Sequence, residues 1–280
     1  MENLLQQGQY LSQFHTGVTN GGRSARVGGD RFMWEQRLFS DTYPADSLER
    51  PKYGALNFFR YVDGGSARFG SCFFTLKDEI STRCTFAYGD SSTNLTTLCT
   101  SDTFIGIVAA MFEDVQKNGR LLNQVIAHPQ EALAVMLNLC MDVKNIGRNL
   151  DYCIETHIHG NVSLADDVDK FYLDESFNGT VFEDQAKLLC ETYEIEIYQI
   201  PKRQIAVHEI GDIFRGPKIP RVAQRVDRIF GNSGGVMNVA LIGDASRNSV
   251  MHPELWADLG TEDEVFMYFK QLWHMVAYFG

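Results

Sequence analysis

The chain has 280 residues, of which 44% are hydrophobic and 22% charged, and its formal net charge is −11. This composition is that of a globular protein of one or two domains and excludes wholesale disorder. No apolar run reaches the roughly 18 to 20 residues that span a bilayer. The first residues also lack the basic start and apolar block of a secretory signal peptide, although export by another route stays open.

The acidic balance bears on the choice of partner. A net negative charge disfavours binding to nucleic-acid phosphates and to anionic membranes, and it favours a basic protein partner. Acidity that serves only solubility is an equally good explanation.

The cysteines form no CxxC pair, and most lie in apolar runs. We therefore expect buried free thiols in a reducing compartment and no zinc site built from cysteines. The residues concerned are Cys72, Cys84, Cys99, Cys140, Cys153 and Cys190.

The first half of the chain begins with a mixed segment, residues 1–48, in which a turn-rich stretch separates two short amphipathic pieces. Three short segments rich in aromatic and β-branched residues then predict strands at 55–61, 68–76 and 82–88. Apolar residues at helical spacing predict the next two elements, helices at roughly 103–117 and 129–145. Ser101 or Asp102 is a candidate cap for the first of these helices.

The second half predicts strands at 152–160, 194–200 and 204–210, with a helix beginning at the sequence SLADDV. Thr261 followed by Glu264 fits a capping box at the start of the last helix. Because the strands cluster instead of alternating with helices, the expected fold class is α+β and not a doubly wound sheet.

A first candidate site is the strand start that runs from Arg50 to Gly54. Pro51 stiffens this start, Tyr53 offers a flat face and a hydroxyl, and Gly54 permits close approach of a ligand to the backbone. Taken alone, the pattern is more typical of a structural strand start.

A second candidate is the sequence FAYGDSS at the end of a predicted strand. A strand that ends in Gly89-Asp90-Ser91 places a carboxylate and hydroxyls on a loop held by a rigid sheet, which is a common position for reacting groups. The alternative is a turn in which Asp90 only accepts hydrogen bonds from nearby backbone N–H groups.

A third candidate is the strand around YCIETHIHG. The period of two places Cys153, Glu155, His157 and His159 on one face. A carboxylate and two imidazoles are costly to bury unless they bind something. Zinc held by Glu155, His157 and His159 is one possibility, but the spacing offers no fourth ligand.

Two further segments carry weaker signals. His208 is a candidate base, although a surface turn is the favoured interpretation. The glycines of GNSGGVMNVALIGDAS suggest phosphate binding only superficially, because the segment has neither a GxGxxG pattern nor a P-loop lysine.

Four segments in this order, RPKYGALN, FGSCFFTL, TFAYGDSS and YCIETHIHG, resemble the ADP-ribosyltransferase domains of bacterial toxins and effectors. Over nearly its full length the chain is more closely similar to the CteC-like family of bacterial effectors, which ADP-ribosylate ubiquitin on threonine. Additional matching segments are QFHTGVTNGG, GDRFMWEQRLF, HEIGDIFRGPKIP and LWHMVAYFG.

This resemblance implies a transferase core over 49–200, made of two packed antiparallel sheets with NAD between them and a helical insertion at 101–150. Residues 1–48 and 201–280 would decorate this core, and one of these decorations, with 201–280 as the main candidate, would recognise the acceptor. The co-substrate would be NAD without a metal, the acceptor ubiquitin, and the location the cytoplasm of a host cell.

The family's catalytic aspartate–glutamate pair corresponds most naturally to Asp90 and Glu155, with Asp63 and Asp102 as alternatives for the aspartate. The resemblance also suggests that Tyr53 and Gly54 contact nicotinamide, and that Asn57, Ser71 and Ser91 contact the rest of NAD. The chain lacks an EPxE or QxE arrangement before its glutamate, which removes the usual signal of arginine modification.

Elementary chemistry supports the pair. Loss of nicotinamide leaves an oxocarbenium-like ribose, which a rigidly held carboxylate stabilises. The second carboxylate either orients the ribose or accepts the proton of the acceptor hydroxyl. Three other functions stay open: an NAD glycohydrolase that uses the same residues, a catalytically inactive binding module, and a metal-dependent hydrolase.

Overall fold

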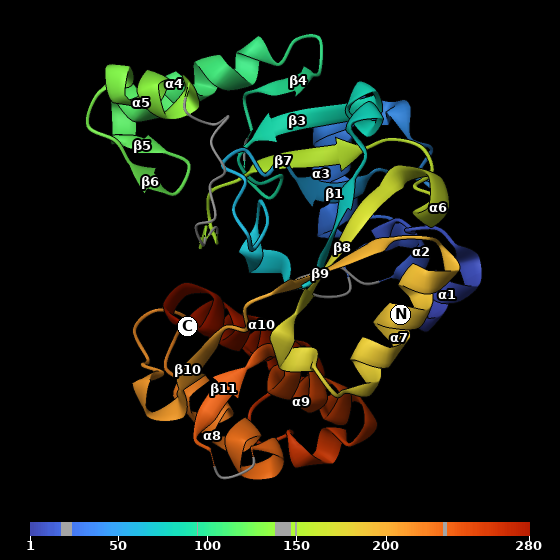
Figure 1. Ribbon diagram of the computed structural model, residues 1–280, viewed down its shortest axis with the longest axis vertical. Helices are drawn as coiled ribbons and strands as arrows, with labels where there is room; N and C mark the ends of the chain where they lie inside the picture. Colours follow the sequence, from blue (N-terminus) through green and yellow to red (C-terminus); the bar gives the residue numbers. More distant parts are fainter. Residues whose placement is uncertain (18–23, 94, 138–146, 149, 232–233) are drawn as a thin grey trace.

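The computed structural model describes residues 1–17, 24–93, 95–137, 147–148, 150–231 and 234–280. It is a mixed α+β structure, as the sequence predicts (Figure 1). Helices surround its two larger sheets, and two smaller ones are formed by the strand pairs β10-β11 (Gln204–Ala206 with Val236–Asn238) and β5-β6 (Arg120–Leu121 with Gln124–Val125). None of the described helices has the length and apolar character that a bilayer span requires.

The first sheet is antiparallel and has the strand order β1-β7-β3-β4. Its central strand β7 is buried at every position, because a strand lies on either side and helices cover both faces. The four strands are β1 (Lys52–Ala55), β7 (Ile154–Ile158), β3 (Cys84–Tyr88) and β4 (Leu98–Thr100).

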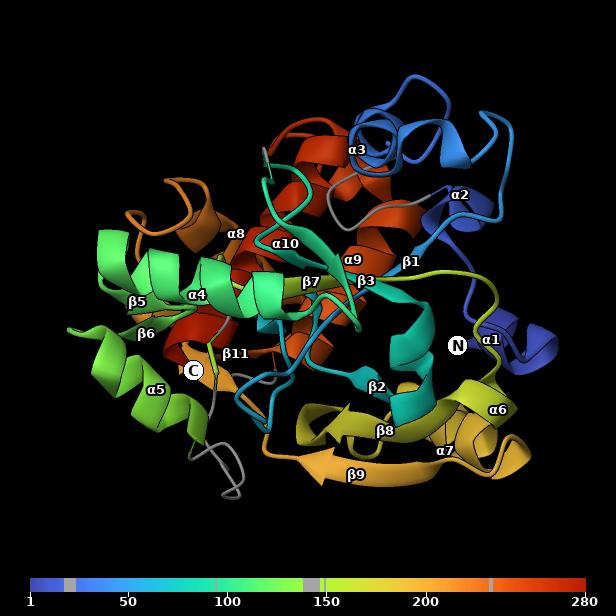
Figure 2. The ribbon, with the colours of Figure 1, turned by 90° about the horizontal axis from the view of Figure 1, so that it is seen from above.

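The two faces of this sheet pack against different helices. On one face, apolar side chains of β3 and β7 join a core with α4 (Ile105–Asn118) and α5 (Pro129–Leu137). On the other face lies α3 (Asp30–Phe39) (Figure 2). Its Phe39 ring contacts the His157 ring edge-on, with 5.1 Å between the ring centroids. The alternation of β7 therefore sends Glu155 and His157 toward α3 and away from the α4 core.

The second sheet has the order β2-β8-β9, with β2 (Phe73–Leu76), β8 (Val168–Asp174) and β9 (Glu196–Ile200). Strands β8 and β9 run parallel, so the prediction of two antiparallel sheets is wrong here. The reason is α7 (Val181–Thr192), a crossover helix that returns the chain to the same end of the sheet. Its Leu189 packs with α1 (Glu2–Gln7) in a core of their own.

The C-terminal region has a separate hydrophobic core. The predicted capping box of Thr261 and Glu264 is confirmed at the start of its last helix. The elements of this region are β10 (Gln204–Ala206), α8 (Ile219–Phe230), β11 (Val236–Asn238), α9 (Val239–Met251) and α10 (Glu262–Phe279).

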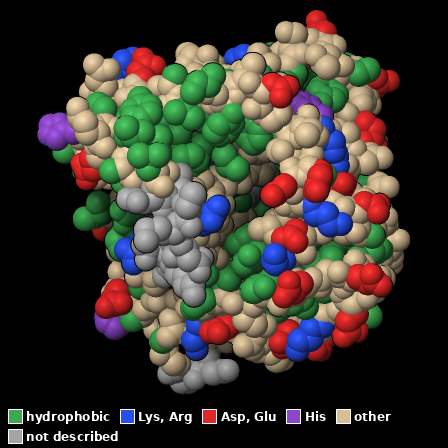
Figure 3. Space-filling model, turned by 45° about the horizontal axis from the view of Figure 1, so that its top comes forward, with side chains coloured by type: hydrophobic (Ala, Val, Ile, Leu, Met, Phe, Trp, Pro, Cys, Tyr) green, Lys and Arg blue, Asp and Glu red, His purple; other side chains and the backbone are tan. Residues whose placement is uncertain are grey.

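The remaining elements are short: α2 (Gln13–Thr16), β5 (Arg120–Leu121), β6 (Gln124–Val125) and α6 (Leu164–Asp167), the helix expected at SLADDV. Helices α4 and α5 also expose apolar side chains, among them Ile105 and Leu137, and apolar side chains gather on the face of the molecule seen in Figure 3.

Several predicted boundaries shift. The strand expected at 55–61 lies earlier, at Lys52–Ala55, because the Asn57 side chain closes a turn by bonding both the N–H and the C=O of Tyr61. The expected strand 68–76 begins only at Phe73, and 204–210 ends as a strand at Ala206. Neither Ser101 nor Asp102 caps α4, whose N-cap is Phe104. The end of the predicted helix 129–145 lies outside the described residues.

Free thiols were predicted for all the cysteines, and this is confirmed for five of them, of which Cys72 is half-buried and the other four are buried. Cys140 lies outside the described residues.

Candidate functional site

A cavity of about 1160 Å³ separates the two sheets. One wall comes from β1 and β7, including Tyr53, Gly54 and Glu155, and the facing wall comes from β2 and β8, including Phe73 and Phe171. This volume is somewhat larger than the range of about 300–1,000 Å³ that small-molecule sites occupy. The cavity therefore has room for a ligand as large as a dinucleotide.

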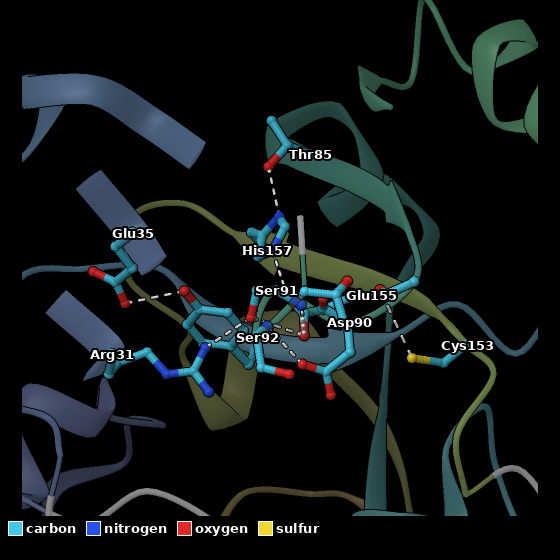
Figure 4. Close-up of polar contacts among 12 residues, drawn as sticks. Arg31, Glu35, Thr85, Asp90, Ser91, Ser92, Cys153, Glu155 and His157 are labelled. Atoms are coloured by element: carbon cyan, nitrogen blue, oxygen red, sulfur yellow. Dashed lines mark hydrogen bonds and ion pairs between the residues drawn. The ribbon is translucent and has the colours of Figure 1, made fainter. Parts of the chain in front are cut away.

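Glu155 is the buried carboxylate in this wall, with 5% of its surface exposed. One carboxylate oxygen accepts hydrogen bonds from the amide and the hydroxyl of Ser91, both at 3.2 Å. The other oxygen lies 2.8 Å from Nε2 of His157 (Figure 4). Three hydrogen bonds to two segments thus fix the orientation of this carboxyl group.

The backbone explains how Ser91 reaches Glu155. Strand β3 ends at Tyr88, and Gly89 then adopts φ +114°, a conformation that favours glycine. The Gly89 amide bonds the carbonyl of Cys153, which holds the turn beside β7. In the register of the sheet, Glu155 is flanked by Ala55 and Ala87, whose small side chains leave its carboxylate accessible from the cavity.

Asp90 also lines the cavity, and it serves the turn as well. Its Oδ1 accepts the Ser92 amide at 2.8 Å, and its Oδ2 lies 3.4 Å from the Arg68 guanidinium. Burial acts to raise the pKa of Asp90, but the hydrogen bonds from Ser92 and the charges of Arg68 and Arg31 outweigh it and lower the pKa. Asp90 therefore stabilises the turn and also presents a carboxylate to the cavity, so the two interpretations of this loop are compatible.

Tyr53 is fixed by residues that sequence reasoning missed. Its hydroxyl donates to Glu35 at 3.0 Å, and the Arg31 guanidinium lies 4.2 Å above its ring. Arg31 also donates to the Ser91 hydroxyl at 3.0 Å, and Arg50 pairs with Glu35 at 2.9 Å in the interior. Helix α3 thus connects both candidate motifs, and the only sequence signal for it was the matching segment GDRFMWEQRLF.

Other predicted residues lie elsewhere. Ser91 is fully buried behind Glu155, and Asn57 closes the turn described above. Ser71 borders a second, much smaller void of about 20 Å³. Asp102 is exposed at the turn before α4, and His208 is exposed on a short helical turn after β10. The structure does not bring these residues to the wall of the large cavity.

Asp63 touches the cavity but is engaged in structural contacts. Its carboxylate accepts the Gly147 amide at 2.6 Å and forms a buried ion pair with Arg203. This aspartate thereby ties the first sheet to the start of the C-terminal region.

The proposed zinc ligands do not converge. Thr85 lies between the two imidazoles, 3.1 Å from Nδ1 of His157 and 3.0 Å from Nε2 of His159. Among the described residues, no three His, Cys, Asp or Glu side chains form a group that could hold a metal ion. Burial, followed by the charges of Glu155 and Asp90, raises the pKa of Cys153 to about 12, so its thiol is not a ready nucleophile.

The last helix also reaches the cavity. Lys270 and Asp263 of α10 line it, and burial, with the nearby charge of Arg68, lowers the pKa of Lys270 to about 8. Arg26, Arg31, Arg68 and Lys52 add further positive charge to the walls. Carboxylates balance these cations in the same walls: Asp30, Asp63, Asp90, Glu155 and Asp263. The acidic sequence as a whole did not predict a cavity with as many cations as carboxylates.

The chain belongs to a family of proteins of unknown function, DUF3626, whose model matches residues 1–279. A comparison with curated proteins finds no match.

Proposed function

We propose that this member of a family without an assigned activity is a mono-ADP-ribosyltransferase, which breaks the bond between nicotinamide and ribose in NAD and transfers ADP-ribose to a protein hydroxyl. The observation that carries the proposal is the position of Glu155: a carboxylate held by three hydrogen bonds, in the wall of a large cavity between two sheets. Two sheets that face each other across a ligand cavity are also what the resemblance implies for the core at 49–200.

The chemistry requires a rigid anion beside the ribose. As the bond from C1′ to the nicotinamide nitrogen breaks, positive charge develops on the ribose, and nicotinamide leaves as a neutral molecule. Glu155 stabilises this charge and accepts a hydrogen bond from the ribose 2′-hydroxyl. Its hydrogen bonds to Ser91 and His157 hold it in place before the reaction, which is the condition for strong electrostatic stabilisation.

The remaining walls suit the other parts of NAD. Tyr53 presents an aromatic face for nicotinamide beside the accessible backbone of Gly54. Guanidinium groups such as those of Arg31 and Arg68 match the geometry of a diphosphate. Because both arginines also contact the Ser91–Asp90 loop, they would place the diphosphate near the catalytic pair.

Asp90 is the base for the acceptor. The acceptor oxygen bonds to C1′ of the cationic ribose, and its proton passes to the Asp90 carboxylate and then to water. A weak base is sufficient, because the hydroxyl becomes strongly acidic only as its oxygen bonds to the cation.

The proposed acceptor is a threonine of ubiquitin, and the proposed setting is a host cell that a bacterial effector enters; both rest on the resemblance. The net charge of −11 suits a basic acceptor surface. The contribution of α10 to the cavity wall supports a role of region 201–280 in recognising an acceptor that approaches the bound NAD.

The test compares the wild-type protein with Glu155→Gln in the presence of NAD and ubiquitin. The variant keeps the shape of the side chain and loses its charge, so transfer and nicotinamide release should fall by about 10²- to 10³-fold. The exposed Glu113→Gln is the matched control and should retain activity. Near-normal transfer by Glu155→Gln contradicts the assignment.

Two further measurements separate the alternatives. Nicotinamide release without any protein gaining ADP-ribose in mass spectrometry indicates a glycohydrolase, and the absence of NAD turnover indicates a binding module. Loss of activity in chelator that zinc restores indicates the metal-dependent hydrolase.

A further inference from the structure

A continuous row of hydrogen bonds leads from Glu155 to Tyr43, a residue that follows α3 in the chain. It passes from Glu155 to His157 (2.8 Å), from His157 to Thr85 (3.1 Å), from Thr85 to His159 (3.0 Å), and from His159 to Tyr43. We call these five residues, Glu155, His157, Thr85, His159 and Tyr43, the hydrogen-bond relay. Of them only Glu155 lines the cavity.

The donors and acceptors of the relay have one consistent order when Glu155 is ionised and both imidazoles are neutral. A carboxylate only accepts, so His157 donates from Nε2 and accepts at Nδ1. The Thr85 hydroxyl must then donate to His157 and accept from Nε2 of His159. Nδ1 of His159 is left to accept the Tyr43 hydroxyl proton, which completes the row.

The surroundings of the relay favour this neutral order. His157 is fully buried, and the rings of Phe39 and Tyr53 contact it edge-on at 5.1 and 5.2 Å. Phe39 also contacts His159, and the Tyr43 ring is stacked parallel to that imidazole. Burial lowers the pKa of His159 and so favours its neutral ring.

We propose that His157 is the positioning residue that orients the Glu155 carboxylate, and that Thr85, His159 and Tyr43 hold its imidazole in the Nε2–H tautomer. The catalytic meaning of this inference rests on the proposed function. In the opposite tautomer, the Nε2 lone pair would face Glu155, which would then have to be protonated and would lose the charge that the reaction needs.

The first test removes the centre of the relay with Thr85→Val, which keeps the shape of the side chain and the strand preference of β3. The matched control is Thr156→Val on β7: Thr156 points to the opposite face, and its buried hydroxyl has no hydrogen-bond partner among the described residues. Thr85→Val should lower kcat for nicotinamide release about tenfold, the effect of one typical hydrogen bond, without changing KM for NAD.

Tyr43→Phe removes the far end of the relay and should lower kcat in the same direction but by less. Tyr43→Phe tests the same relay if Thr85→Val does not fold. Wild-type kcat in both variants, or a loss equal to that of Thr156→Val, overturns the inference.

The second test does not depend on activity. In ¹⁵N spectra of the imidazoles at neutral pH, the wild-type protein should show His157 with its proton on Nε2, and the signal can be assigned by its loss in His157→Gln. Thr85→Val should change this signal, and Thr156→Val should not. A proton on Nδ1 of wild-type His157 overturns the relay. If the wild-type protein does not turn over NAD, the proposed function fails, whereas the spectra still decide the order of the relay.

Discussion

Ser91 donates two hydrogen bonds to one oxygen of Glu155, the first from its amide and the second from its hydroxyl. Asp90 directly precedes Ser91, so the loop that carries one carboxylate of the candidate pair also orients the other. Arg31 joins the same hydroxyl from α3. Any displacement of this loop would therefore change the orientation of Glu155 and the position of Asp90 together.

Ser91→Ala separates the hydroxyl from the amide. The variant keeps the backbone hydrogen bond to Glu155 and loses the side-chain one together with the hydrogen bond from Arg31. We therefore expect kcat for NAD cleavage to fall about tenfold. Steady-state kinetics with a melting curve measure this. The control is Ser81→Ala, at an exposed serine that precedes β3 in the sequence. An unchanged kcat would mean that the amide and His157 suffice to hold Glu155.

The sequence predicted local features of this site well. The alternation of Cys153, Glu155, His157 and His159 along one strand predicted that Glu155 and His157 share a face, because strand geometry alone fixes which side chains are neighbours. The hydrogen bond between these two residues agrees with that prediction. The same reasoning missed Arg31 and Glu35. Both residues belong to α3, which precedes β7 by more than 100 residues in the sequence. The packing of α3 over β7 depends on tertiary contacts that no short sequence pattern encodes.

The strand predicted at 55–61 was also misplaced because of a contact that the sequence pattern does not show. Its aromatic residues favour a strand, but the Asn57 side chain satisfies the backbone of Tyr61 and turns the chain. A side chain that replaces backbone pairing is visible only in the folded structure.

Asp63→Asn should affect stability more than chemistry. The substitution leaves the buried Arg203 guanidinium without its anionic partner, and loss of one partner from a buried ion pair costs about 3–5 kcal/mol. Urea unfolding measures this difference. Asp258→Asn, which breaks the exposed ion pairs with Arg221 and Arg225, is the control and should change the unfolding midpoint little. If the urea unfolding midpoint of Asp63→Asn equals that of the wild type, the ion pair does not stabilise the fold, and Asp63 is again a candidate for a role in the cavity.

His274 should make the protein less stable in mild acid. Burial, with the charges of Arg215, Lys270 and Arg68, lowers the pKa of His274 to about 3 in the folded protein, whereas the unfolded chain titrates near about 6.5. The unfolded state therefore binds the proton first. The contribution of His274 to the free energy of unfolding is complete above about pH 6.5. It is lost as the pH falls toward 3, at about 1.4 kcal/mol per pH unit.

The comparison uses His274→Leu, which cannot titrate. Between pH 7 and pH 5 the free energy of unfolding of the wild type should fall by about 2 kcal/mol more than that of the variant. Urea unfolding at the two pH values gives both numbers. Parallel losses in the two proteins would show that His274 does not titrate differently on unfolding.

Asp90→Asn separates the two roles of the Asp90 loop. The asparagine carbonyl can still accept the Ser92 amide, so the turn should survive and the melting temperature should stay near that of the wild type. The amide cannot accept a proton from the acceptor hydroxyl, and general-base catalysis contributes about 10²- to 10⁴-fold. Transfer of ADP-ribose to ubiquitin should therefore fall by at least about 10²-fold.

The control for the lost ion pair of Asp90 is Arg68→Gln, which removes the contact with Arg68 and keeps the carboxylate. If the charge of Asp90 serves only to hold Arg68, both variants should lose the same activity. If Asp90 is the base, Asp90→Asn should lose transfer while it still binds NAD, and Arg68→Gln should weaken NAD binding more than it slows transfer. Equilibrium binding of NAD and the rate of transfer, measured on both variants beside their melting curves, distinguish these outcomes. If Asp90→Asn transfers ADP-ribose at the wild-type rate, Asp90 has no catalytic role and serves only to stabilise the turn.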